Sequence, residues 1–145
     1  MQQVTQNKTK TMDNQHVLFM PKLYDETMQL LVQSKNYFNL YSSEDQRQLS
    51  PLQRLIYSAV MSRITLRLST TMGWIMARRA FHAGQVTQEE LDNHYRLMFQ
   101  NECMQESTYF HHFLPKFVQK LCKDSLALYS RIHALDNIGN QQQMA

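Results

Sequence analysis

Arginine and aromatic side chains that recur every three or four residues are the first feature of this sequence that could do chemistry. Arg63, Arg67, Trp74 and Arg78 fall on one side of a helix, with threonines between them. Arg78 follows Trp74 by four residues, within reach of a cation–π contact. A guanidinium tolerates partial burial and binds carboxylates at two points. The pattern therefore predicts ionic recognition on this helix face.

Two interpretations of the arginine face stay open. In the internal interpretation, each arginine pairs with an acid from a packed helix, and the candidates are Asp25, Glu26, Asp124 and Asp136. In the other, Arg63, Arg67, Trp74 and Arg78 bind a partner, which would be an acidic peptide or nucleic acid. Nucleic acid is the weaker choice, because the net charge is only +3 and a helix with apolar residues all round cannot lie in a groove of DNA.

Motifs for catalysis, metals and cofactors are missing from the sequence. The six histidines form no HExxH pattern, and three glycines cannot make a phosphate-binding loop. Cys103 and Cys122 belong to no CxxC pair, which argues against a zinc site and suits a reducing cytosol. We therefore predict no catalytic residue, no metal, no cofactor and no enzyme activity.

A long helix must position the arginine face. Ser50 is a good N-cap, Pro51 suits the first helical position, and Gly84 suits the left-handed residue that ends a helix. The helix between them should have 33 residues and a length of about 50 Å. Between Gln46 and Gln88 the chain has six arginines and no lysine, aspartate or glutamate. Apolar residues lie on more than one face of this helix, which predicts neighbouring helices on more than one side.

Three further helices should pack against this central one. Apolar residues recur with a helical period from Lys22 to about Tyr41. Thr87 and Glu90 form a capping box that should open a helix reaching to about residue 101. A last helix should run from Pro115 to near residue 136, with a heptad stripe made by Leu114, Val118, Leu121, Ser125, Leu128, Ile132 and Leu135. We predict an all-α antiparallel helical bundle built around one long central helix.

Composition divides the chain into three parts. Residues 1–14 are rich in Gln, Thr, Asn and Lys and are expected to be disordered, residues 15–137 to form the bundle, and residues 138–145 to form a flexible tail. The N-terminus lacks the apolar core of a signal peptide, and no run of about 18 apolar residues could span a membrane. The expected location is the cytoplasm.

The residues of the central helix also resemble those of a known family. Arg63-Ile64-Thr65-Leu66-Arg67-Leu68 is followed by Trp74, seven residues after the second arginine, and this is not a generic bundle pattern. The resemblance is to the RcdA family, the regulators of CtrA degradation in alphaproteobacteria, and it spans roughly residues 19–137. The other segments that carry it are Leu23 to Phe38, Gly73–Met76, Arg78–Ala80, Gly84, Leu114-Pro115 and Ser125 to Asp136.

The resemblance implies a small helical bundle that forms a homodimer and has no catalytic activity. It also implies an adaptor that helps the ClpXP protease capture chosen cargo proteins during the cell cycle. Such adaptors work with a response-regulator-type priming factor and a cyclic-di-GMP-binding partner. We expect a protein-interaction adaptor in regulated proteolysis; the alternatives are a nucleic-acid-associated regulator and a structural subunit of a larger assembly.

Overall fold

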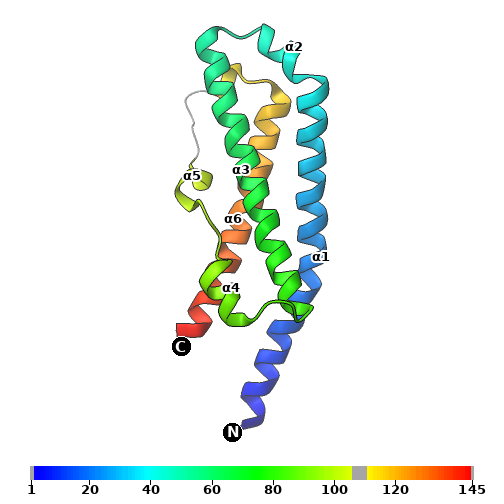
Figure 1. Cartoon of the computed structure of the whole chain (residues 1–145), viewed down its shortest axis with the longest axis vertical. Coiled ribbons are helices and arrows are strands. Elements are labelled where there is room, and N and C mark those ends of the chain that lie inside the picture. Colours follow the sequence, from blue (N-terminus) through cyan, green and yellow to red (C-terminus); the bar gives the residue numbers. More distant parts are fainter. Residues whose placement is uncertain (1, 106–110, 145) are drawn as a thin grey trace.

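Three long helices lie side by side and make up most of the protein (Figure 1). The structure is a computed structural model, and it describes residues 2–105 and 111–144. The long helices are α1 (Gln2–Leu40), α3 (Pro51–His82) and α6 (Lys116–Met144); the short elements are α2 (Ser42–Arg47), α4 (Gln88–His94), α5 (Gln100–Met104) and the 3-10 helix η1 (His111–Phe113). The predicted all-α fold with one long central helix is confirmed.

Local signals set the two ends of α3. The Ser50 hydroxyl accepts a hydrogen bond from the backbone N–H of Gln53 at 3.2 Å, and the Gln53 side chain accepts one from the backbone N–H of Ser50 at 3.0 Å. This capping box satisfies two N–H groups at the start of the helix. Past the other end, Gly84 has a φ of +75°, which costs a glycine little. The predicted bounds of the central helix are therefore correct to within one residue.

Helix α3 packs against both other long helices, which explains its apolar residues on several faces. It contacts α1 and α6, and the core between the three is built from aliphatic and aromatic side chains. Ile64 and Ile75 of α3 and Val118 and Leu128 of α6 are fully buried. The heptad stripe predicted for the last helix thus faces the core, with Leu135 packed at its edge.

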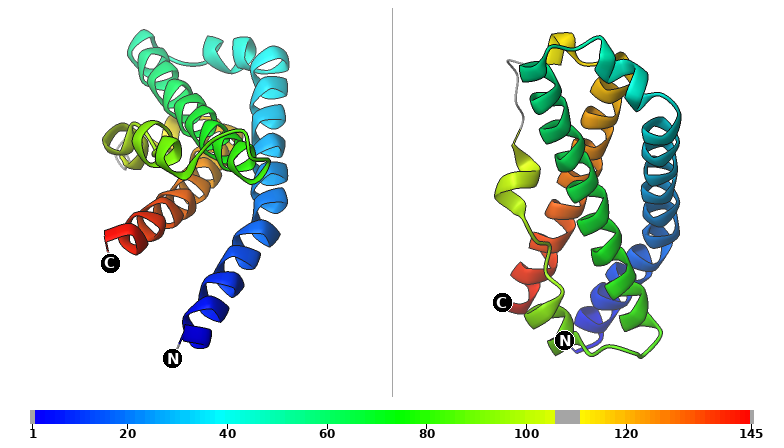
Figure 2. Two further views of the ribbon diagram at one scale, coloured as in Figure 1. Left: turned by 60° about the horizontal axis from the view of Figure 1, so that its bottom comes forward. Right: turned by 45° about the horizontal axis from the view of Figure 1, so that its top comes forward.

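The long helices do not all alternate in direction. Helix α1 runs antiparallel to α3, as predicted, but α6 runs in the same direction as α3 (Figures 1 and 2). The reason is the chain between α3 and α6, which passes α4 and α5 and returns to the end where α3 begins. In a bundle whose successive segments alternate in direction, the second and the fourth segment are parallel, so this arrangement agrees with the predicted bundle.

Helix α1 and helix α6 both extend beyond the predicted bounds. Helix α1 begins at Gln2 and α6 continues to Met144, while the disorder expected for residues 1–14 and the flexibility expected for residues 138–145 stay predictions. Once a helix has formed, each further residue adds one backbone hydrogen bond, so a polar sequence can prolong it. Pro21 lies inside α1, one residue before the predicted start of this helix. The missing N–H of proline favours a kink, and α1 changes direction in its blue part (Figure 2).

The predicted third helix is broken in two. The Thr87 capping box is present, with Thr87 accepting from the Glu90 N–H at 3.1 Å, but α4 ends at His94. Phe99 then takes a left-handed conformation, with a φ of +58°, before α5 begins. A non-glycine residue in that conformation interrupts a helix, and Arg96 in the break reaches to α6, as described below.

Across the part of the chain that the structure describes, no helix combines the length and apolar character needed to cross a membrane.

Candidate partner-binding surface

Asp136 lies at the centre of a buried polar cluster that joins α3, α6 and the segment before α5. Its side chain is inaccessible to solvent. It accepts hydrogen bonds from the Trp74 indole N–H at 3.0 Å, from Arg78 at 3.2 Å and from Arg96 at 2.9 Å. The Arg78 guanidinium also stacks on the Trp74 ring at 4.0 Å, which is the predicted cation–π contact. This cluster joins the C-terminal part of α3 to the C-terminal part of α6.

The donors around Asp136 keep its carboxyl group ionised. Burial alone raises the pKa of Asp136, but the hydrogen bonds from Arg96 and Trp74, together with the charges of Arg96 and Arg78, outweigh it and leave the pKa below its usual value. Burial, together with the charge of Arg96, lowers the pKa of Arg78 to about 10, although the Asp136 carboxylate acts in the opposite direction. Arg78 thus remains a cation at neutral pH, and two guanidiniums face a single carboxylate in this cluster.

Arg67 connects α3 to backbone carbonyls on two other elements. Its side chain is 1% exposed. The guanidinium donates to the carbonyl oxygens of Cys103 at 2.7 Å, Gln105 at 2.9 Å and Cys122 at 3.2 Å. The first two carbonyls lie at the C-terminal end of α5, where unpaired acceptors need donors. Arg67 therefore attaches α5 and α6 to the central helix.

The internal interpretation describes most of the arginine face, with a correction to its partners. Of the four acids proposed, Asp136 is the one that pairs with an arginine of α3 among the described residues. Glu26 pairs instead with Arg131 of α6, and Asp124 with Lys120 at 3.8 Å. Carbonyl oxygens replace the expected carboxylate at Arg67, and no sequence pattern marks such acceptors.

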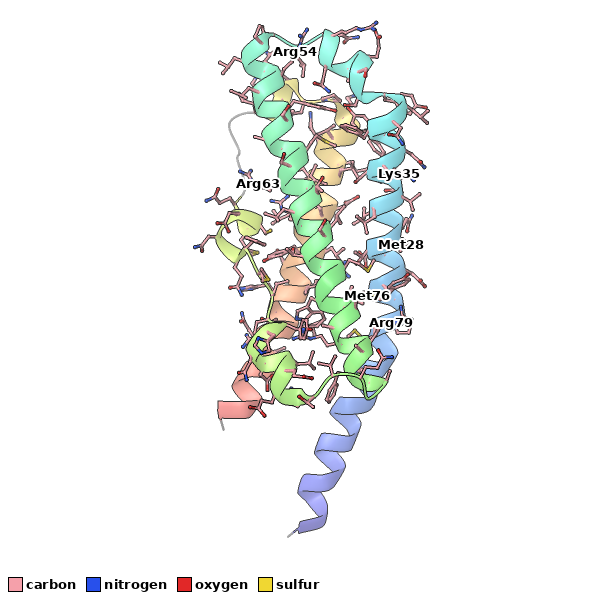
Figure 3. The ribbon with its side chains drawn as sticks, in the orientation of Figure 1. Met28, Lys35, Arg54, Arg63, Met76 and Arg79 are labelled. Carbon is pink, nitrogen blue, oxygen red and sulfur yellow. The ribbon has the colours of Figure 1, made fainter. Side chains whose placement is uncertain are left out.

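The fold does not place the four residues predicted to bind a partner on one exposed surface. Arg67 and Trp74 are buried, and the side chain of Arg78 is 15% exposed, so packing accounts for all three. Arg63 is half-buried and faces outward on α3 in Figure 3. A partner-binding role for this set stays a prediction. Because the other three side chains are more buried, Arg63 is the member most accessible to a partner.

A long groove lies between α1 and α3. Its volume is about 730 Å³. Leu31 and Phe38 of α1 and Met61 and Leu66 of α3 give it apolar walls, and Phe38 is 61% exposed. Its floor on α3 carries small polar residues, namely Ser58, Ser62, Thr65 and Ser69. We call this recess the α1–α3 groove.

Positive charges border the α1–α3 groove. Lys35 lines it, and Figure 3 shows Lys35, Arg54 and Arg79 along the two helices that form it. The Nε of Arg54 donates to the carbonyl of Gln46, a residue that lines the same groove. Near the opposite end of the same helix pair, the Arg79 guanidinium lies 4.7 Å from the Tyr24 ring of α1. The groove therefore has apolar and small polar walls and one lining cation, Lys35, while Arg54 and Arg79 lie on α3 outside its lining.

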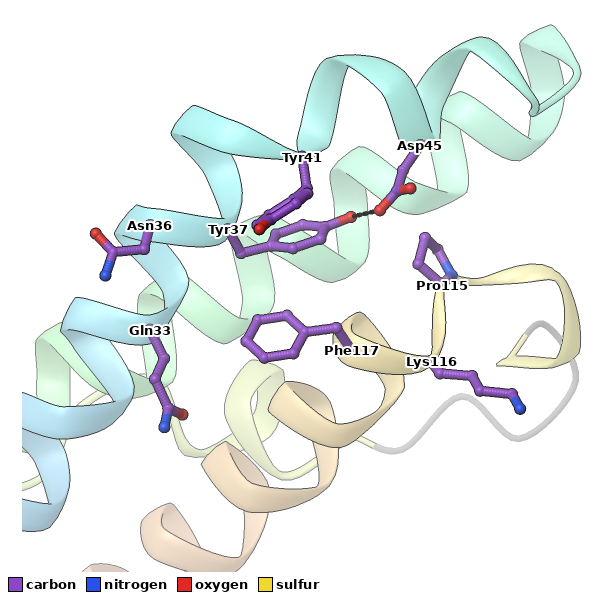
Figure 4. Close-up of a pocket in the computed structure, with 8 residues that line it drawn as sticks. All are labelled: Gln33, Asn36, Tyr37, Tyr41, Asp45, Pro115, Lys116 and Phe117. Atoms are coloured by element: carbon purple, nitrogen blue, oxygen red, sulfur yellow. Dashed lines mark hydrogen bonds between the residues drawn. The ribbon is translucent and has the colours of Figure 1, made fainter.

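A second, smaller pocket lies between the end of α1 and the start of α6. It has a volume of about 490 Å³, and its aromatic wall is Tyr37, Tyr41 and Phe117 (Figure 4). The Tyr37 and Phe117 rings stack at 5.2 Å. The Tyr37 hydroxyl donates to Asp45 at 2.7 Å and accepts from Tyr57 at 3.0 Å. Burial and these two neighbours raise the pKa of Tyr37, so its hydroxyl stays protonated and fixes the junction of α1, α2 and α3.

Sequence reasoning missed the residues that border these recesses, although one signal was present. On α1 the residues Tyr24, Met28, Leu31, Lys35 and Phe38 recur at alternating steps of four and three. This stripe lies beside the buried stripe of Leu23, Thr27 and Leu30. A helix that packs on the core with one face needs only one such stripe. The second stripe on α1 therefore indicates a further surface, which is the α1 wall of the groove.

The fold and these surfaces define a helical-bundle protein of three long helices with open grooves. The chain belongs to the family described as "Protein of unknown function (DUF1465)", whose model matches residues 11–145. Among solved structures, the chain is similar to RcdA from Caulobacter crescentus CB15, with 24% sequence identity and a TM-score of 0.66. The match covers 83% of this chain and 90% of that one. It shows that the predicted RcdA-like fold is correct. No curated protein matches the sequence.

Proposed function

We propose that this protein is a non-enzymatic adaptor that binds proteins and delivers substrates to the ClpXP protease in cell-cycle-regulated proteolysis. The observation that carries the proposal is the RcdA-like fold, which extends over most of both chains. The resemblance of the central helix, from Arg63 to Trp74, points to the same family. An exposed apolar groove supports a binding role, because such recesses on a folded protein mark interaction sites.

The partners in this proposal are the ClpXP machinery, a response-regulator-type priming factor and the cargo. The protein would act in the cytoplasm as a homodimer. A second copy needs a self-complementary surface, since a two-fold interface brings the same patch of both subunits together. The exposed Tyr95, Met98 and Phe99 around the break between α4 and α5 provide an apolar surface for it.

The test is a reconstituted degradation assay with purified ClpXP, priming factor and radiolabelled cargo candidates. Full-length protein should accelerate degradation of one or more cargo proteins and leave an unrelated ClpXP substrate unaffected. Sedimentation velocity on the same preparation should show a dimer. If no cargo is degraded faster, and a pull-down from native lysate returns one stoichiometric companion without the protease, the protein is a structural subunit instead.

A further inference from the structure

The charged residue among those that line the α1–α3 groove is a cation, Lys35, and this favours an acidic occupant. Helix α3 carries no aspartate or glutamate anywhere along its length. On α1 the lining positions 31, 34, 35 and 38 are also free of acids. The acids of the short helix α2, Glu44 and Asp45, adjoin Gln46 at one end of the groove and do not line it.

The shape of the groove fits a helix. Ser58, Ser62, Thr65 and Ser69 recur along α3 at steps of four, three and four, so small side chains form a continuous floor. Small residues let another backbone come close, while Phe38 and Met61 at the sides can pack against apolar residues of the occupant. Beyond the groove, Met28 and Met76 continue the apolar surface, with exposed fractions of 38% and 49% (Figure 3). Methionine adapts its shape to varied partners.

We propose that the α1–α3 groove binds an acidic amphipathic helix of a partner protein. The apolar face of that helix lies on the serine floor between Phe38 and Met61. Its acidic flanks reach Lys35 and Arg54 at one end and Arg79 at the other. Arg54 and Arg79 are separated by about 37 Å along α3, which gives room for a helix of several turns. The inference rests on the proposed function, because it assigns partner chemistry to a surface of an adaptor.

Charge also argues against a second copy of this chain as the occupant. In a two-fold dimer formed through this groove, the groove would face itself. Lys35, Arg54 and Arg79 of one subunit would then lie near the same cations of its partner, and like charges across an interface weaken it. An acidic helix is attracted to these cations and not repelled by them. Its attraction to the groove should weaken as salt is added.

The experiment measures binding of two synthetic peptides to the full-length protein by fluorescence anisotropy at low and at high salt. Both peptides are amphipathic helices of about 18 residues, or about 27 Å, with leucine on one face. One has glutamate on the other face, and its matched control has lysine. The acidic peptide should bind saturably at low salt and lose about tenfold in affinity at high salt. The basic peptide should not bind.

Variants locate the binding to the groove. Lys35→Glu and Arg79→Glu should each weaken binding of the acidic peptide about tenfold, and Ser62→Phe should abolish it by filling the floor. Lys123→Glu reverses an exposed charge on α6 and is the matched control, with unchanged binding. Circular dichroism confirms that each variant is folded. Equal binding by all variants, or no binding of the acidic peptide, would overturn the proposal.

Two further measurements separate the other occupants and the proposed function. If duplex DNA of random sequence binds more tightly than the peptide, and the Lys35→Glu variant no longer binds the DNA, nucleic acid is the ligand and the proposal fails. If Ser62→Phe dissociates a dimer in sedimentation velocity, a second copy occupies the groove and the proposal also fails. Peptide binding without any effect on ClpXP degradation contradicts the adaptor function alone. Full degradation activity in variants that no longer bind the peptide contradicts the groove assignment alone.

Discussion

Asp136 illustrates how a single buried charge can determine the pH range in which this protein is stable. Its pKa is lower in the folded protein than in the unfolded chain, because Arg96, Trp74 and Arg78 stabilise the carboxylate more than burial destabilises it. Its contribution to stability is therefore fully present above the unfolded pKa of about 3.9 and is lost as the pH falls through the folded value. We expect the free energy of unfolding to decrease when the pH is lowered below about 4.

Substitution of Asp136 tests this expectation directly. Asp136→Asn leaves two partly buried guanidiniums without a counter-ion and should lower the free energy of unfolding by about 3 kcal/mol at neutral pH. The difference from the native protein should shrink in acid, where Asp136 becomes neutral. Urea denaturation followed over a pH series measures both effects. Asp124→Asn, which alters the exposed pair with Lys120, is the control and should change stability by less than about 0.5 kcal/mol. A constant difference at all pH values would contradict this account.

Arg67 gives a second prediction, because its burial decides between a packing role and a binding role. Arg67→Ala removes the donor from three carbonyl oxygens and should destabilise the protein by about 3 kcal/mol. Arg67→Lys should recover less than half of this loss, since one ammonium group cannot reproduce the planar fork of a guanidinium. Thermal unfolding monitored by circular dichroism measures the change. An unchanged melting temperature together with lost partner binding would show that Arg67 contacts a partner instead.

At the scale of the helices, two glycines near each other in sequence should respond to alanine in opposite ways. Gly73 lies inside α3, and a Cβ added there meets no atom within 4 Å. Gly73→Ala should therefore stabilise the protein by about 0.5–1 kcal/mol through the better helix propensity of alanine. Gly84→Ala should destabilise it by about 1 kcal/mol, because the φ of +75° is strained for a side chain. Equal effects of the two substitutions on urea midpoints would refute this explanation of the helix end.

The same helices show which parts of the fold the sequence can predict. Ser50, Pro51 and Gly84 determine the ends of α3 through contacts with their own neighbours in the chain, so the local pattern was sufficient. Thr87 likewise marked the start of α4. The end of α4 was not predictable, because it depends on the left-handed Phe99 and on the contact of Arg96 with Asp136, forty residues away.

The candidate site was less predictable than the fold. Spacing placed Trp74 and Arg78 together correctly, and Asp136 was among the acids expected to pair with them. Which residues remain exposed depends on how three helices pack, and one helix pattern does not contain that information. The pattern of the arginine face therefore left both an internal and a partner-binding interpretation open, and Lys35 of the groove was not singled out because it is a single lysine on a different helix.

For the whole molecule, the position of α3 between α1 and α6 predicts how it unfolds. Helix α3 packs against both α1 and α6, and its buried side chains belong to the shared core, so separating either neighbour exposes part of α3. Backbone N–H groups in the middle of α3, at Ile64 and Leu68, should then exchange with solvent only when the entire bundle opens. The free energy from their exchange rates should equal that from urea denaturation.

The same argument sets the expectation for α6 and for a destabilised variant. Amides near Leu128 and Ile132 of α6 should report the same free energy as α3, because these residues are fully buried against the shared core. Arg67→Ala should lower both values together, since its guanidinium bonds α6 at Cys122 as well as α5. If exchange mass spectrometry instead found α6 opening while α1 and α3 stayed protected, the bundle would consist of two separable units. The central helix would then not be the element on which the fold depends.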